Sequence, residues 1–333
     1  MTNQPINQSS NHPIIQLTGP TMKTLICPLN WGLGHATRCV PVIRQLLAEG
    51  HETVVVSDGY PLEFLRQEFP TLRFIEYPSY PVYYAAGKSQ VGAMIFNIPA
   101  ILKGILNEHT WLRNLLQTEH FDQVISDNRF GMWNKQVYSI YITHQLMVKM
   151  PKSLKSLEPL VHLIHKFFID RYDECRIPDV EEKNGLSGDL SHKYPLPLHA
   201  TFIGPLSRFR GMESYLPDTR YKVVAVISGV EPQRTLFEKS LIDRFKNAGH
   251  TTLIVAGMPQ SEKTVKQTNN ITLVSHLPDS ELASVLLGAT KIISRSGYST
   301  IMDLKALNCL HKAELIPTPG QTEQEYLKLI HNS

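Results

Sequence analysis

A glycine loop that ends in a histidine, Asn30-Trp31-Gly32-Leu33-Gly34-His35, separates an apolar run from a stretch with helical spacing. Small residues such as Gly32 and Gly34 let backbone amides approach a ligand, and the N-terminus of the following helix favours negative charge. Imidazole titrates near neutral pH, so His35 is our first candidate for a general base. A histidine at a helix start is also a common cap or turn residue, and this structural interpretation stays open.

Two loops in the second half of the chain carry groups suited to a nucleotide diphosphate. Ser228 and Gly229 form a tight turn between an apolar run and a helical stretch, which predicts a phosphate cradle. In Ser294-Arg295-Ser296-Gly297-Tyr298-Ser299-Thr300, hydroxyls, a glycine and a guanidinium precede a helix that carries Asp303. Such a helix start suits a diphosphate, and a carboxylate one turn later suits ribose hydroxyls. Serine and threonine are also ordinary N-caps, so a purely structural role is the alternative.

Two series of alternating strands and helices must position these loops. The first has expected strands at 24–29, 53–57, 72–75, 123–126 and 138–143 and helices at 35–49 and 90–117. After a Pro- and Gly-rich connection with a short strand near 201–203, the second has strands at 223–227, 252–255, 271–274 and 291–294 and helices at 232–247, 279–287 and 298–307. This order predicts an α/β fold of two Rossmann-like parallel-sheet domains facing a cleft. Ligands of such sheets bind at the carboxyl ends of the strands.

The composition limits the class of protein. A length of 333 residues suits about two domains. With 33 basic and 30 acidic side chains the formal charge is +3, which gives no support to a nucleic-acid partner. The four cysteines, Cys27, Cys39, Cys175 and Cys309, form no CxxC pair, so we expect neither a zinc site nor a disulfide scaffold, and a cytoplasmic location fits best. No run reaches the roughly 18 apolar residues of a spanning helix, which favours a soluble or peripheral protein.

The first glycine loop permits a weaker alternative, a dinucleotide site of a dehydrogenase. Asp58 ends the second expected strand about where a ribose carboxylate belongs. However, Thr37 stands where the fingerprint has its third glycine. The dehydrogenase is therefore a secondary hypothesis.

The loop ending in His35, the Ser228-Gly229 turn, the Arg295-Ser296-Gly297 run with Asp303, and Gln324-Glu325-Tyr326 together resemble glycosyltransferase family 28. Its MurG-like members have the GT-B fold. Three segments are closer still in sequence to bacterial family-28-related glycosyltransferases of undefined acceptor. They are 29–38, Ser126-Asp127-Asn128-Arg129 and Ile142-Thr143-His144-Gln145. The resemblance implies an N-terminal acceptor-side domain over 22–204, a linker over 205–221 and a C-terminal nucleotide-sugar-binding domain over 222–333. Residues 1–21 have the composition of a disordered extension.

Position by position, the resemblance implies roles for individual residues. Arg208 would pair with a donor phosphate, Leu277 would bind uracil through its main chain, and Asp303 would take the ribose hydroxyls. The family has Glu where this chain has Asp303 and Gln where it has Glu325, which leaves the donor sugar open. The whole expected donor set is Arg208, Ser228, Gly229, Leu277, Arg295, Ser296, Gly297, Ser299, Thr300, Asp303, Gln321, Gln324 and Glu325. The expected acceptor-side set is Gly32, Gly34, His35, Asn128, Arg129 and His144.

The resemblance also implies a reaction. It is the inverting, metal-independent transfer of a hexosamine-type sugar, N-acetylglucosamine or a close relative, from a UDP donor to a glycan or lipid-linked acceptor, without a cofactor. His35 is the first choice for the base and Asp127 the second, although Asp127-Asn128 is equally good turn chemistry. A nucleotide-sugar 2-epimerase and a catalytically inactive nucleotide-sugar-binding protein are the alternatives.

Two features bear on the membrane and on closure of the cleft. Residues 149–168 combine four lysines with the single acid Glu158 and with apolar residues at helical spacing, which suits a helix on the inner face of the cytoplasmic membrane. A core-facing helix with a basic solvated side is the alternative. GT-B chains usually end with a helix that crosses back onto the first domain, and we expect that closing helix to be missing beyond the helix that begins near Thr322.

Overall fold

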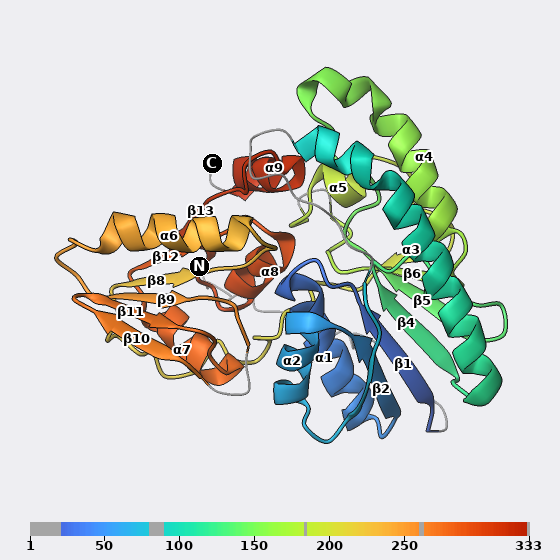
Figure 1. Cartoon of the computed structure of the whole chain (residues 1–333), viewed down its shortest axis with the longest axis horizontal. Helices are drawn as coiled ribbons and strands as arrows, with labels where there is room; N and C mark the ends of the chain where they lie inside the picture. Colours follow the sequence, from blue (N-terminus) through green and yellow to red (C-terminus); the bar gives the residue numbers. More distant parts are fainter. Residues whose placement is uncertain (1–20, 80–89, 183–184, 260–262, 332–333) are drawn as a thin grey trace, which may run out of the picture.

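The computed structural model describes residues 21–79, 90–182, 185–259 and 263–331, which form two α/β domains side by side (Figure 1). Each domain has its own largely parallel sheet covered by helices. Except for Thr21, the expected N-terminal extension lies outside the described residues.

The N-terminal sheet has seven parallel strands in the order β3-β2-β1-β4-β5-β6-β7. Its inner strands are apolar runs that are buried almost throughout, because helices cover both faces of the sheet. The strands are β1 (Lys23–Pro28), β2 (Glu52–Ser57), β3 (Arg73–Glu76), β4 (Gln123–Asp127), β5 (Tyr138–Ile142), β6 (Glu174–Ile177) and β7 (Ala200–Phe202). The helices are α1 (Leu33–Ala48), α2 (Gly59–Glu68), α3 (Gln90–Thr118), the 3-10 helix η1 (Lys152–Leu157), α4 (Glu158–Ile169) and α5 (Asp189–His192).

The C-terminal sheet has six strands in the order β10-β11-β9-β8-β12-β13, and only the pair β10–β11 is antiparallel. Its strands are β8 (Val223–Val226), β9 (Thr252–Val255), β10 (Val265–Thr268), β11 (Ile271–Val274), β12 (Lys291–Ser294) and β13 (Ala313–Leu315). Its helices are α6 (Gln233–Phe245), α7 (Asp279–Gly288), α8 (Tyr298–Ala306), the 3-10 helix η2 (Leu310–Lys312) and α9 (Thr322–His331). Residues 203–222 connect the two sheets.

The structure confirms the α/β class with two parallel-sheet domains, and the expected strands and helices end within two residues of the observed ones. Besides the short elements α5, η2 and β13, the sequence analysis missed α2, β6 and β10. Helix α2 opens with Gly59 and contains Pro61, which resemble turn residues. Strand β6 alternates two charged residues with Cys and Ile, and β10 is an exposed edge strand without an apolar face. Each therefore lacks the hydrophobic pattern by which such elements are found.

Helices α8 and α9 join the two domains. Ser299 on α8 donates its hydroxyl to the Gly34 carbonyl over 2.8 Å, and the Tyr326 hydroxyl on α9 accepts the Asp189 amide over 2.7 Å. Figure 1 shows α9 beside α5, at the junction of the domains. Helix α9 itself thus contacts the N-terminal domain and helps to bridge the two domains. None of the described helices combines the length and the apolar character that crossing a bilayer requires.

Candidate active site

The sheet register brings the first two candidate residues together. Strands β1 and β4 are neighbours, with Pro28 beside Asp127 at their carboxyl ends. The loop after β1 leads into α1, so His35 in the first turn of that helix lies over the end of β4. His35 Nδ1 is 2.6 Å from Asp127 Oδ1. The imidazole remains 15% exposed while the carboxylate is fully buried, which is the arrangement expected of a base held by an internal acid.

Arg38, one turn after His35 on α1, fixes the Asp127 carboxylate. Its guanidinium donates to both carboxylate oxygens and is itself 1% exposed. Burial opposes the charge on Asp127, but Arg38 and His35 outweigh it and hold the pKa of this carboxyl below its usual value. Asp127 is therefore an ionised, acceptor-only group at neutral pH, which makes it a partner for His35 and not a free base.

This geometry determines which imidazole nitrogen can accept a proton. His35 Nδ1 has two neighbours, Asp127 Oδ1 at 2.6 Å and Arg38 Nη2 at 3.0 Å. The ionised carboxylate only accepts hydrogen bonds and is the nearer of the two, so we assign to Nδ1 the hydrogen that it donates to Asp127. His35 Nε2 then has the free lone pair. A neutral imidazole oriented by a carboxylate in this way can take a proton from a bound hydroxyl group.

The same network continues into the second domain. Arg38 Nη1 donates to His144 Nδ1 over 2.9 Å, and because arginine has no acceptor, His144 Nε2 carries the hydrogen that it donates to Glu323 over 2.9 Å. Burial lowers the pKa of His144, which Glu323 only partly offsets. The His144 ring stacks on Tyr298 with centroids 4.2 Å apart. Helices α8 and α9 of the second domain therefore contact His144, which in turn is bonded to Arg38.

On the donor side, the structure brings Arg208 and Asp303 together. Arg208 Nε donates to Asp303 Oδ2 over 3.1 Å, and the Ser207 hydroxyl donates to Asp303 Oδ1 over 2.7 Å. Arg208 also donates to Asp279 at the start of α7 over 2.9 Å. Burial raises the pKa of Asp303 to about 6 against the opposing effects of Arg208 and Ser207. The expected phosphate and ribose ligands thus form one buried cluster, with the Arg208 guanidinium already paired.

The remaining donor-side residues lie in the loops after the strands of the second sheet. The Ser296 hydroxyl donates to the Gln324 carbonyl over 2.8 Å, and Gln324 donates to Gln321 Oε1 over 2.6 Å. Gly229 has a φ of 107° with open space at its Cβ position, and a Cβ on Gly32 would lie 3.5 Å from the Gly229 Cα. The two glycine turns therefore face each other across the domain boundary. The others are Ser228 after β8, Leu277 after β11, and Gly297, Ser299 and Thr300 at the start of α8.

Several expected site residues lie elsewhere or have other partners. Arg129 is fully buried and pairs with Glu108 on α3 over 2.8 Å, which is a structural role inside the N-terminal domain. Arg295 lies 4.0 Å from the centre of the Phe237 ring on α6 and donates to the Pro317 carbonyl, so its guanidinium is directed to the α6 side. Glu325 is exposed, and Glu323 is the acid of α9 that contacts the first domain.

Asn128 stays close to the His35–Asp127 pair. It follows Asp127 with a left-handed backbone, φ 56°, and accepts a hydrogen bond from the Tyr141 hydroxyl over 3.2 Å. Arg38 and Glu323 are members of this network that sequence reasoning missed, as are Ser207 and Asp279 in the cluster around Arg208. The spacing of Arg38, three residues after His35 on one helical face, is the signal that points to it. Among the described residues, no three His, Cys, Asp or Glu side chains are grouped so that they could hold a metal ion.

Comparisons with known proteins agree with this architecture. No protein-family model matches the chain. Two curated proteins named uncharacterized glycosyltransferase, from Methanosarcina acetivorans and Methanosarcina mazei, are 26% and 25% identical over 91% of this chain and 82% of their own length. Membership of family 28 stays a prediction.

Solved structures share the whole fold. The glycotransferase of kitacinnamycin aligns with a TM-score of 0.57 and 14% identity over 94% of this chain and 91% of its own. Arabidopsis thaliana UGT89C1 complexed with UDP-L-rhamnose aligns with a TM-score of 0.55 and 12% identity over 94% of this chain and 82% of its own. A putative UDP-N-acetylglucosamine 2-epimerase from Listeria monocytogenes aligns with a TM-score of 0.53 and 10% identity over 94% of this chain and 88% of its own. The chain has the GT-B architecture of glycosyltransferase structures.

Proposed function

We propose that this chain is an inverting, metal-independent glycosyltransferase that moves a hexosamine-type sugar, N-acetylglucosamine or a close relative, from UDP to an acceptor hydroxyl. The observation that carries the proposal is the His35–Asp127 pair. It lies at the carboxyl edge of the first sheet of a GT-B fold, and the loop before His35 is bonded to the donor-side helix α8. The names of the relatives support the same class of activity.

In this proposal His35 Nε2 takes the proton of the acceptor hydroxyl as its oxygen attacks the anomeric carbon. The bond between that carbon and the UDP oxygen breaks, and UDP leaves with the electron pair. Asp127 stabilises the imidazolium that forms, because it is ionised and bonded to Nδ1. Direct displacement from the opposite face inverts the configuration at the anomeric carbon.

The donor would lie along the loops of the second sheet. We assign its diphosphate to the Ser228-Gly229 turn and to the start of α8, where hydroxyls and backbone amides favour negative charge. Asp303 would accept the ribose hydroxyls, and Arg208, which is bonded to it over 3.1 Å, would neutralise charge on the leaving UDP. Gln321 and Gln324 would face the sugar, and Glu325, whose side chain is exposed, would reach it only from the solvent side. In this assignment the choice of donor sugar is made by residues of α9 and of the loop directly before it.

The acceptor is a glycan or a lipid-linked sugar, and we propose that the protein works at the inner face of the cytoplasmic membrane. Helix α4 supports this location, since one side of it presents apolar residues to the outside. Leu160 and Leu163 are 55% and 61% exposed. The alternative, in which this face of α4 packs against the core, disagrees with the exposure of these leucines.

A 2-epimerase is the second candidate, because a protein named as one shares the fold. An inactive nucleotide-sugar-binding protein is the third. Mass spectrometry and NMR of the products of UDP-N-acetylglucosamine, with and without a panel of glycan and lipid-linked acceptors, separate the three. A transferase yields UDP and a glycoside of inverted configuration. An isomerised sugar nucleotide formed without acceptor, or an unchanged donor with every acceptor, would contradict the proposal.

A further inference from the structure

Arg295 is the one buried arginine of the described residues that has no acidic partner. Six arginines in this part of the chain are buried. Five of them form an ion pair with a carboxylate: Arg38, Arg129, Arg176, Arg208 and Arg234. Arg295 is 5% exposed. A buried charge without a counter-ion is unfavourable, so its guanidinium lacks an anion that the described residues do not supply.

The groups that do contact the Arg295 guanidinium are neutral. Nη1 donates to the Pro317 carbonyl over 2.9 Å and Nη2 to the Gln233 carbonyl over 3.4 Å, whereas the buried Nε has no hydrogen-bond partner within the described chain. Arg295 Cζ lies 4.0 Å from the centre of the Phe237 ring. Burial lowers the pKa of Arg295 to about 10, so it keeps its charge at neutral pH. The carbonyls and the ring face offset only part of that charge.

Arg295 lines a cavity between α6 and the segment that follows β13, which we call the α6 cavity. Figure 1 shows α6 lying along one face of the second sheet. The α6 cavity has a volume of about 410 Å³, which is within the range of small-molecule sites. Its apolar wall includes Leu236 and Phe237 of α6 and Ile316 and Pro319 after β13. One buried cation thus borders a largely apolar space.

The acids on the elements around the α6 cavity have cationic partners of their own. Glu314 on β13 binds Arg244 over 2.8 Å and Lys291 over 2.6 Å, and these cations lower its pKa to about 2. The two acids of α6 are engaged in the same way, in the pairs Glu238–Arg234 and Asp243–Lys246. The segment 316–321 contains no acid. An anion for Arg295 must therefore come from outside these elements.

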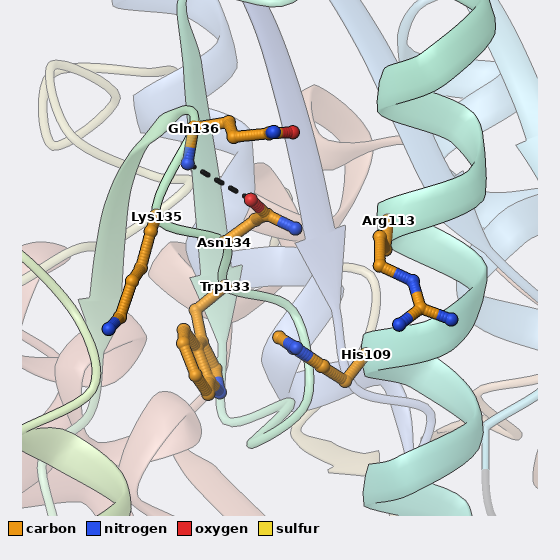
Figure 2. A pocket seen from close by; sticks show the side chains of 6 residues that line it. All are labelled: His109, Arg113, Trp133, Asn134, Lys135 and Gln136. Carbon is orange, nitrogen blue, oxygen red and sulfur yellow. Dashed lines mark hydrogen bonds between the residues drawn. The ribbon is translucent and has the colours of Figure 1, made fainter.

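A cavity of about 310 Å³ in the N-terminal domain provides a contrast. Figure 2 shows its Trp133 and His109 rings between the side chains of Arg113 and Lys135. Both of these cations are exposed, so water solvates their charge and neither needs a counter-ion. The charge of Arg295 is buried, and this difference singles out the α6 cavity.

We propose that the α6 cavity binds a small organic acid, in which one carboxylate is joined to an apolar body. The planar guanidinium of Arg295 matches a carboxylate in shape and in charge. One unpaired cation balances the single charge of a carboxylate, whereas a phosphate monoester carries nearly two charges. The apolar body of the acid would lie against Leu236 and Ile316, where its burial favours binding.

The α6 cavity adjoins the segments that hold Gln324 but is separate from the expected donor site. Ser296, next to Arg295, donates its hydroxyl to the Gln324 carbonyl over 2.8 Å. Thr318, next to Pro317, donates its amide to Gln324 Oε1 over 2.8 Å. The acid would therefore bind on the α6 side of these segments. This inference goes beyond the proposed function and requires no sugar transfer.

Calorimetric titration of the full chain with 3-phenylpropionate, and with the neutral 3-phenylpropan-1-ol as matched ligand, tests the proposal. We expect saturable binding of the carboxylate, about tenfold or more tighter than that of the alcohol, because a charged acceptor strengthens the bond to the guanidinium. Arg295→Met should remove this difference. Leu236→Glu, at a side chain 45% exposed, adds an acid to the cavity wall and should weaken carboxylate binding, whereas the control Leu329→Glu on α9, at 72% exposed, should not.

Three results would overturn the inference: no binding of 3-phenylpropionate, equal affinity for the acid and the alcohol, or undiminished carboxylate binding in Leu236→Glu. The last result decides the matter even where Arg295→Met does not fold. Competition between 3-phenylpropionate and UDP would place the acid in the donor site and would also contradict the inference. Titration with UDP separates it from the proposed function. Retained UDP binding without binding of the acid refutes only the α6 cavity as a site, and the reverse refutes only the donor site.

Discussion

Replacing Arg38 by methionine would leave the Asp127 carboxylate buried with too few partners. Both groups are at most 1% exposed, and Arg38 supplies bonds to both carboxylate oxygens, so that afterwards His35 is the main donor left. Removing one partner of a buried pair costs about 3–5 kcal/mol of unfolding free energy. Because the His35 bond persists, we expect Arg38→Met to lie near the lower end, at about 3 kcal/mol.

The cost should depend on pH with a definite sign. In the unaltered chain the pKa of Asp127 is depressed, so its stabilising contribution is complete above the unfolded-state value of 3.8 and is lost only as the pH falls below it. Without Arg38, burial dominates and raises the pKa of Asp127. The variant then gains stability relative to the unaltered chain as the pH falls from neutral and the carboxyl becomes protonated. The difference between the two proteins should therefore shrink toward pH 5.

Urea unfolding followed by tryptophan fluorescence measures this difference in the relevant domain, because Trp31, Trp111 and Trp133 are the three tryptophans and all precede the second sheet. Arg38→Met/Asp127→Asn, which removes both charges, should recover most of the loss. Arg73→Met is the control, since it breaks the ion pair of Arg73, whose side chain is 54% exposed, and should cost under about 1 kcal/mol. A loss below about 1 kcal/mol for Arg38→Met, a loss independent of pH, or an additive double variant would refute the reasoning.

Three further outcomes follow from the site. His35→Ala should lower the rate of sugar transfer by about 10²–10⁴-fold and leave the UDP dissociation constant unchanged. The control His120→Ala, at a histidine whose side chain is 83% exposed, should alter neither quantity. Weakened UDP binding in His35→Ala would contradict the division of roles. Affinity for UDP-N-acetylglucosamine, whose esterified diphosphate does not titrate in this range, should fall as the pH drops from 7 to 5, because Asp303, whose pKa is raised to about 6, becomes protonated and no longer accepts ribose hydroxyls as a carboxylate. Asp303→Asn should bind this donor weakly without that pH dependence, and calorimetric titration showing the same profile in both proteins would argue against ribose at this site. Glu323→Gln weakens a charge-assisted hydrogen bond to His144 and should lower the hydrogen-exchange protection of α9 by about tenfold. The control Glu325→Gln should leave this protection unchanged. Equal protection in the two variants would mean that the His144 contact does not hold α9.

The His35–Asp127 pair was within reach of sequence reasoning because both residues directly follow apolar runs. Parallel strands bring such carboxyl ends to one edge of a sheet. What the sequence left undecided was the role of each group. In our proposal the difference in burial assigns the base to His35, since Asp127 is enclosed and bonded to Arg38 while His35 is partly exposed. Burial is a tertiary property, and no local pattern encodes it.

The charged residues show the same limit. Arg129 and Arg295 stand in loops where ligand contacts are expected, yet their partners, Glu108 and Phe237, lie 21 and 58 positions away on helices. On α9, Glu323 and Glu325 are two positions apart and so face different sides, and only the packing of the helix selects Glu323. Similarly, the composition of 149–168 left two orientations of α4 open, and the polar partners of His162 and Glu158 determine which side is inside.

The proposed function requires the second domain to bind a uridine diphosphate sugar for transfer at His35. Isothermal titration of the purified chain with UDP, UDP-N-acetylglucosamine and NAD, first without metal and then with magnesium, measures this binding. We predict saturable binding of both uridine ligands that magnesium does not change, and no binding of NAD. Binding of NAD alone would favour the dinucleotide alternative, and binding of no uridine ligand under either condition would contradict the account.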